Sequence, residues 1–135
     1  MLRAQRCVAA LVCAGAVLAG CSSPDGTSSG ASCAAPRTTA SAEQARPGQA
    51  VQISAESMWD GCNDQGINEP LPPLTDQPII WRQAGADVEL TRVDADPDSG
   101  HAQATVRVPV TARPGKAQIQ LGTSSQAVTI IVKAG

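Results

Sequence analysis

Alternation of apolar and polar side chains is the feature that most constrains how this chain folds. Val51, Ile53 and Ala55 alternate with polar neighbours, and the pattern returns along the rest of the chain. A period of two residues places the apolar side chains on one face of a β-strand. The alternating or short apolar segments are 51–55, 79–81, 88–91, 102–110, 117–121 and 128–132. No segment has the 3.6-residue period of a helix, so we predict an all-β domain.

Turn-forming residues separate these segments. Asp96–Gly100, Arg113–Gly115 and Gly122–Ser125 are rich in Gly, Pro, Asp and Ser. Short strands divided by such turns are typical of antiparallel sandwiches and small barrels. We expect a sandwich of about six to seven short strands, with the first of these turns as a hairpin between Val93 and Ala102.

Two residues of these segments have positions that follow from their chemistry. Trp81 adjoins two isoleucines in a chain with no Phe and no Tyr, which predicts that its ring lies in the core. Pro109 lacks an amide donor, so we expect it at a sheet edge or a bulge.

The first twenty residues have the pattern of a secretory signal peptide. Arg3 and Arg6 precede the apolar run 7–19, which is shorter than the ~20 residues that a membrane-spanning helix needs. The run ends in Leu-Ala-Gly-Cys at residues 18–21, which resembles the bacterial lipobox. That resemblance implies cleavage before Cys21 and attachment of a diacylglyceryl group to its thiol. Two or more acyl chains anchor a protein stably without a transmembrane helix. An ordinary signal peptide that releases a free secreted domain is the alternative.

The cysteines are consistent with such processing. Cys7 and Cys13 would leave with the signal peptide, and Cys21 would carry lipid. Cys33 and Cys62 remain as a pair outside the reducing cytoplasm, where we expect them to form a disulfide. Closing this loop would contribute about 3–4 kcal/mol in the chain-entropy model. A reactive or metal-binding pair of thiols is the alternative.

Composition divides the chain into three parts. Residues 1–20 form the predicted lipoprotein signal peptide, and residues 21–46 the lipidated Cys and a flexible tether rich in Ser, Thr, Ala and Pro. The tether has too few large apolar side chains to order itself. Residues 47–135 form the predicted sandwich domain.

The domain resembles a known family. The segments ARPGQAVQISAESMWDGC (45–62) and LTRVDADPDSGHAQATVRVPVTARPGKAQIQLG (90–122) are similar to the single Ig-like domains of small actinobacterial lipoproteins, and more distantly to IPT/filamin-like surface domains. In these families a Pro-Gly pair opens the first strand, and a hairpin with a Val-Pro…Pro-Gly pattern joins two late strands. The resemblance implies a binding or structural module without catalytic residues. Cys33 precedes the first clear strand, so the expected disulfide differs from the one between the sheets of antibody domains.

The long segment between the first two apolar segments is the candidate binding surface. It contains four prolines, and loops of this length in compact domains are often functional. We name Trp59, Asp60 and Asp64 as candidate contact residues, because an exposed indole beside acidic groups suits a sugar, a peptide or a protein partner. The alternative for Trp59 is packing on the disulfide.

Three acids recur at a spacing that is typical of the start of a calcium loop. Asp94, Asp96 and Asp98 stand two residues apart, but Ser99 and Thr105 occupy the positions where an EF-hand needs Gly and Glu. A solvated turn is the favoured interpretation, and the three acids are a weak metal candidate. We expect no cofactor.

The sequence gives little support to an enzyme. His101 is the only imidazole, it stands beside a turn in the polar register of Gln103, and no G-x-S-x-G motif is present. We therefore expect an exposed His101 and no catalytic residues. Two alternatives stay open: a small envelope hydrolase that uses His101 with a nearby Asp, and a metal-handling lipoprotein that uses the Asp94–Asp98 acids, Met58 or His101.

Charge and localisation complete the expectation. The formal net charge is −2, and only two aromatic residues are present, so the chain lacks the basic surface and stacking platform of a nucleic-acid-binding protein. We expect a non-enzymatic lipoprotein on the outer face of the cell membrane. Its partners would be the membrane, through the lipid anchor, and an envelope protein or glycan of unknown identity.

Overall fold

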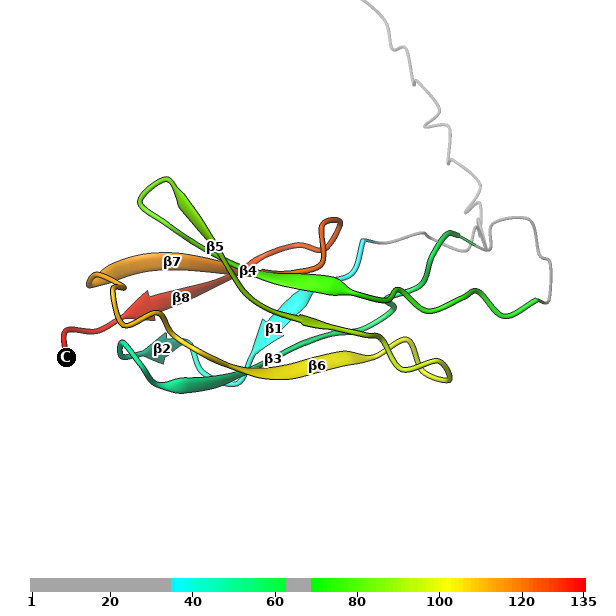
Figure 1. The fold of residues 1–135 in the computed structure, drawn as a ribbon, viewed down its shortest axis with the longest axis horizontal. Coiled ribbons are helices and arrows are strands. Elements are labelled where there is room, and N and C mark those ends of the chain that lie inside the picture. The colour runs from blue at the N-terminus through cyan, green and yellow to red at the C-terminus, as the bar shows by residue number, and fades with distance from the viewer. Residues whose placement is uncertain (1–34, 63–68) are drawn as a thin grey trace, which may run out of the picture.

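The structure, a computed structural model, describes residues 35–62 and 69–135 and is all-β (Figure 1). These residues form no helix, and hence none that is long and apolar enough to cross a membrane. The strands are β1 (Thr38–Ala40), β2 (Gln44–Ala45), β3 (Ala50–Ala55), β4 (Gln77–Gln83), β5 (Ala86–Val93), β6 (Ala102–Arg107), β7 (Gly115–Leu121) and β8 (Val128–Val132).

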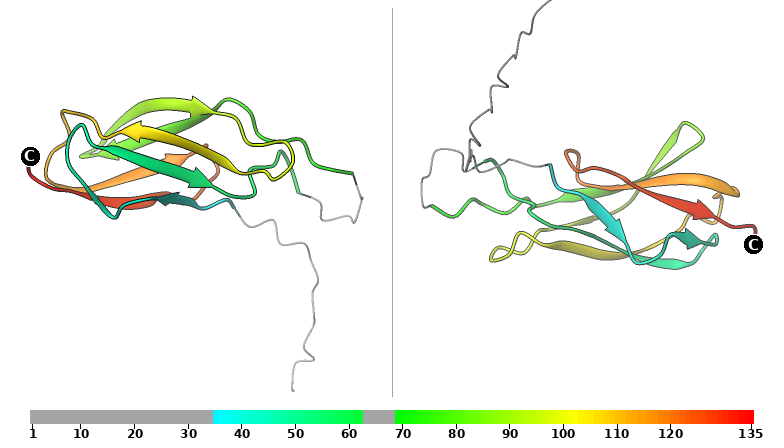
Figure 2. Two further views of the ribbon diagram at one scale, coloured as in Figure 1. Left: turned by 90° about the horizontal axis from the view of Figure 1, so that it is seen from below. Right: turned by 180° about the vertical axis from the view of Figure 1, so that it is seen from behind.

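The strands form two sheets that face each other as a sandwich (Figure 2). One sheet has the order β1-β3-β6, and the other has the order β2-β8-β7-β4-β5. All neighbours are antiparallel except β2 and β8, which run parallel. The predicted all-β sandwich is thus confirmed.

The described part of the chain has eight strands, where about six to seven were expected. The additional strands are β1 and β2, which lie within the segment 21–46 that we predicted to be tether. Their residues are Thr, Ala and Gln, so no alternation of large apolar side chains marks them. Backbone pairing with β3 and β8 holds them instead. The sandwich therefore begins at about residue 37, ten residues earlier than the pattern indicated.

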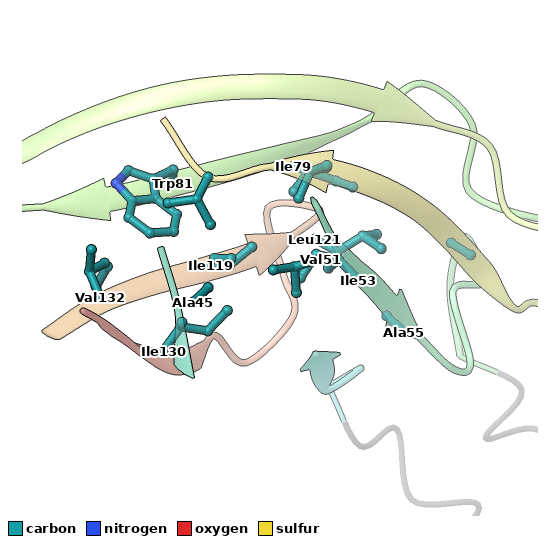
Figure 3. Close-up of a cluster of buried hydrophobic side chains, with 14 of the residues drawn as sticks. Ala45, Val51, Ile53, Ala55, Ile79, Trp81, Ile119, Leu121, Ile130 and Val132 are labelled. Carbon is teal, nitrogen blue, oxygen red and sulfur yellow. The ribbon is translucent and has the colours of Figure 1, made fainter. Parts of the chain in front are cut away.

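The core lies between the two sheets, where apolar side chains of β3 and β6 meet those of β4, β7 and β8 (Figure 3). Ile53 and Ile79 are fully buried, and the Trp81 residue is only 2% exposed, which confirms its prediction as a core residue. Burying one large aliphatic side chain contributes about 1.5–3 kcal/mol.

Two predicted hairpins are instead connections between the sheets. Asp96–Gly100 leads from β5 to β6, and Pro109–Pro114 leads from β6 to β7, and in both cases the two strands belong to different sheets. The hairpin expected between Val93 and Ala102 is therefore wrong. Turn residues specify a change of direction, but they do not specify whether the next strand pairs with the previous one. Pro109 follows β6, an edge strand, as expected for a residue without an amide donor.

Alternation predicted burial correctly along β3 and β6 and wrongly at two positions elsewhere. Val51 and Ile53 of β3 are buried, as are Val106 and Val108 on and after β6. Val88 on β5 is 44% exposed, and Val110, placed on the apolar face of the 102–110 segment, is 81% exposed. Residues 86–89 of β5 are all exposed, and β6 ends before Val110, so the facing sheet covers neither side chain.

Candidate functional site

Trp59 lies at one end of the sandwich, in a short backbone ladder. The amide of Met58 donates to the carbonyl of Gly100 at 2.8 Å, and the amide of Leu74 donates to the carbonyl of Met58 at 2.9 Å. The amide of Asp60 donates to the carbonyl of Pro72 at 2.8 Å. These bonds fix the strand-like segment that carries Trp59 between residues 72–74 and Gly100. We call the surface formed by Glu56, Trp59, Asp60 and Asp96–His101 the Trp59 end.

The Trp59 ring packs on the backbone of Gly100. A Cβ atom added at Gly100 would lie 2.4 Å from Cε2 of the ring, and the φ angle of Gly100 is +65°, which L side chains rarely adopt. The indole is half-buried, so part of it stays accessible to a ligand. Within the described residues, the ring thus rests on a glycine, a support that neither sequence interpretation of Trp59 named.

The acidic candidates have different positions. Asp60 is exposed beside Trp59, whereas Asp64 lies outside the described residues. Cys62 is disulfide-bonded, and its expected partner Cys33 also lies outside the described residues, so the identity of the pair stays a prediction. The signal peptide and Cys21 lie outside them too.

Two of the three acids of the weak metal candidate, Asp94 and Asp96, accept hydrogen bonds from the protein's own backbone. Asp94 Oδ1 accepts the amide of Asp76 at 2.7 Å. Asp96 Oδ1 accepts the amides of Asp98 and Ser99 and the Ser99 hydroxyl, at 2.8–3.0 Å. Hydrogen bonds from Ser99 and Asp98 lower the pKa of Asp96, because they favour the ionised carboxylate. In residues 35–62 and 69–135, no three His, Cys, Asp or Glu residues are grouped so as to hold a metal ion.

His101 forms an ion pair that the sequence analysis did not foresee. Its Nδ1 lies 2.6 Å from Oε1 of Glu56, and its Nε2 lies 3.3 Å from Oε1 of Gln103. Both partner atoms are acceptors, so the doubly protonated ring satisfies both. The hydrogen bond to Glu56, followed by the one to Gln103, raises the pKa of His101 above its ordinary value. The imidazole is half-buried, not fully exposed as expected.

This geometry explains why the sequence analysis missed Glu56. Ala55 of β3 pairs with Ala102 of β6, so the preceding and following residues, His101 and Glu56, stand opposite each other. Only the register between β3 and β6 brings these two residues together, and they are forty-five positions apart in the sequence. A local sequence pattern does not show this register.

The residues at the Trp59 end do not form a catalytic or metal-binding site of the kind that the hydrolase or the metal-handling alternative needs. A general base needs a free acceptor nitrogen that faces a nucleophile, but both nitrogens of His101 face acceptors. Among the described residues, no Ser, Thr or Cys side chain is hydrogen-bonded to this ring. Met58, named as a metal-ligand candidate, is 1% exposed and packs in the core.

The all-β sandwich therefore presents, at the Trp59 end, a half-buried indole surrounded by acidic side chains. Exposed acids at this end include Glu56, Asp60, Asp96 and Asp98. Such a surface suits binding through an aromatic face and hydrogen bonds. No protein-family model matches the chain, and no curated protein matches it.

Proposed function

We propose that this chain is a lipid-anchored extracytoplasmic lipoprotein, whose Ig-like sandwich acts as a non-enzymatic binding or structural module of the cell envelope. The observation that carries the proposal is Leu-Ala-Gly-Cys at residues 18–21 directly after a basic start and an apolar run of thirteen residues. In Ig sandwiches, strands B and E are neighbours in one sheet, strands C and F are neighbours in the other, and a buried Trp lies on strand C. The pairs β3–β6 and β4–β7 and the buried Trp81 on β4 match this arrangement, which supports the resemblance to Ig-like domains.

The topology suits an anchor at one end. Thr38 of β1 pairs with Ala55 of β3, so the described chain enters the sandwich at the Trp59 end. Sixteen residues, 22–37, separate Cys21 from Thr38, and a chain of that length reaches at most about 55 Å. A lipid on Cys21 would therefore tether the domain to the membrane through the Trp59 end.

Labelling with palmitate tests the anchor. Cells that express the full chain should incorporate the label and hold the protein in the membrane fraction, and Cys21→Ala should abolish both. Cys13→Ala is the matched control, because it removes a cysteine from the same region outside the lipobox and should leave labelling unchanged. An unlabelled wild-type protein in the culture supernatant would contradict the proposal.

A further inference from the structure

The end of the sandwich opposite Trp59 collects several connections. The amide of Gly48 donates to the carbonyl of Val108, and the amide of Lys133 donates to the carbonyl of Ala45. The turn of the β4–β5 hairpin and the C-terminal residues lie toward this same end (Figure 1). The pairing of Gly115 with Val132 also places the start of β7 here.

This end is basic. Five of the eight Lys and Arg residues in the described part of the chain are located here, all are exposed, and no ion pair involves any of them. We call them the basic end: Arg46, Arg107, Arg113, Lys116 and Lys133. The β5 acids nearby are already compensated, because Asp87 pairs with Arg82 at 3.0 Å and Glu89 pairs with Arg92 at 2.8 Å.

A shallow groove of about 270 Å³ opens between the β4–β5 hairpin and the connection from β6 to β7. Its apolar lining consists of Trp81, Ala84, Ala86, Val88, Pro109 and Ala112. Arg113 also lines it, and its backbone is fixed by Gln83: Nε2 of Gln83 donates to the Arg113 carbonyl at 2.7 Å, and Oε1 accepts the Arg113 amide at 3.0 Å. The groove thus combines an apolar floor with a basic side chain on a fixed backbone.

Exposed apolar groups and an open strand edge adjoin this groove. Val88 and Val110 are the two large hydrophobic residues that are exposed in the described part of the chain. Val88 lines the groove, and Val110 stands between two lining residues. β5 is the last strand of its sheet and pairs with β4 alone, so its outer edge leaves backbone donors and acceptors available to another strand.

We propose that this groove binds an acidic, extended segment of a partner protein, which pairs with the outer edge of β5. The segment's apolar side chains would cover Val88 and the groove floor. Its carboxylates would face Arg113 and the other basic side chains of the basic end. Peptides commonly add as a strand to an open sheet edge, where main-chain bonds give affinity and pockets give specificity. An anionic polysaccharide would use the charges, but it would leave the apolar floor and the strand edge without a role.

The probe is a fluorescent library of eight-residue peptides that alternate Asp or Glu with Val, Leu or Ile. It is titrated into the full chain as cells produce it, purified in mild detergent, and binding is followed by polarisation. We expect saturable, salt-sensitive binding, and amide NMR shifts confined to β5 and residues 109–113. Because binding is measured in solution, it is independent of lipidation, which the mass of the purified chain reports separately.

Two variants separate the groove from charge alone. Val88→Lys adds a positive charge but blocks the apolar contact, and Arg113→Glu reverses the groove charge; each should weaken binding at least tenfold. Arg37→Glu is the matched control, because it makes the same charge change at the Trp59 end and should have less than a twofold effect. Undetectable binding at millimolar peptide would overturn the proposal. A Val88→Lys variant that binds the peptides as well as the wild type would also overturn it. So would dextran sulfate that binds the wild type with the same NMR shifts as the peptides. Either result would show that charge alone drives binding, as for a polyanion.

Discussion

Gly100 carries two constraints that together fix Trp59. Its φ angle of +65° disfavours any L side chain, and its missing Cβ makes room for the indole. Gly85 has a φ angle of +79°, but nothing lies within 4 Å of its would-be Cβ. These two glycines therefore separate the cost of the backbone conformation from the cost of overpacking.

We expect Gly100→Ala to be more destabilising than Gly85→Ala. Gly85→Ala, the control, should lower the free energy of unfolding by about 1–2 kcal/mol, the cost of the left-handed conformation. Gly100→Ala should lose about 1–3 kcal/mol more, because the methyl group forces the ring out of place. Urea unfolding followed by tryptophan fluorescence measures both. Equal losses would show that Trp59 does not pack on Gly100.

His101 and Glu56 predict a pH dependence with a definite sign. The folded-state pKa of His101 is raised, so its contribution to stability is fully present below the unfolded pKa and is lost as the pH rises through the folded pKa. Glu56→Gln should bring the pKa of His101 down toward its ordinary value and flatten this dependence.

NMR titration reads the pKa directly, because the chain has a single histidine. Glu43→Gln removes an exposed carboxylate elsewhere and is the control. A pKa of His101 that is unchanged by Glu56→Gln, or lowered equally by Glu43→Gln, would contradict the ion pair.

At the scale of elements, a buried polar network adds to the backbone pairing that holds β1. Thr38 is 2% exposed, and its Oγ1 accepts the amide of Leu121 at 3.0 Å and is hydrogen-bonded to the hydroxyl of Ser125 at 2.9 Å. Gln120 Nε2 donates to the Ser125 carbonyl at 2.8 Å. These bonds join β1 to β7 and to the turn that follows it, across the two sheets.

Thr38→Val should destabilise the domain by about 1–3 kcal/mol, because it keeps the shape but leaves the Leu121 amide buried without an acceptor. Thr39→Val is the matched control: this neighbour is exposed, and surface changes usually stay within about 0.5 kcal/mol. Thermal unfolding measures the difference, and amide exchange should show faster exchange in β1. A Thr38→Val variant as stable as Thr39→Val would mean that the network contributes nothing.

At the scale of the whole molecule, the predicted disulfide between Cys33 and Cys62 would enclose β1, β2 and β3 in one loop. We expect Cys33→Ser with Cys62→Ser to lower the free energy of unfolding by about 3–4 kcal/mol. Reductant should lower the melting temperature of the wild type and leave the double variant unchanged. Two titratable thiols at these positions in the unreduced protein would contradict the pairing.

Opposite charges divide the molecule along its length. The basic end carries five unpaired basic side chains, and the Trp59 end carries Glu56, Asp60, Asp96 and Asp98. Along the sequence the acidic and basic residues alternate irregularly over about ninety positions, and the formal net charge of −2 does not reveal that they separate to opposite ends. The division exists because antiparallel strands return alternate connections to the same end of a sandwich.

The sequence alone determined six strand segments, five that alternate with period two and the short apolar run 79–81, since side-chain direction along a strand is a local property of the backbone. It also placed Trp81 in the core and the 122–125 turn between β7 and β8. It could not determine β1 and β2, which exist only because β3 and β8 supply pairing partners. Which sheet each strand joins, the register that sets His101 against Glu56, and the exposure of Val88 and Val110 were decided by tertiary structure. Each of these depends on contacts between residues that are far apart along the chain.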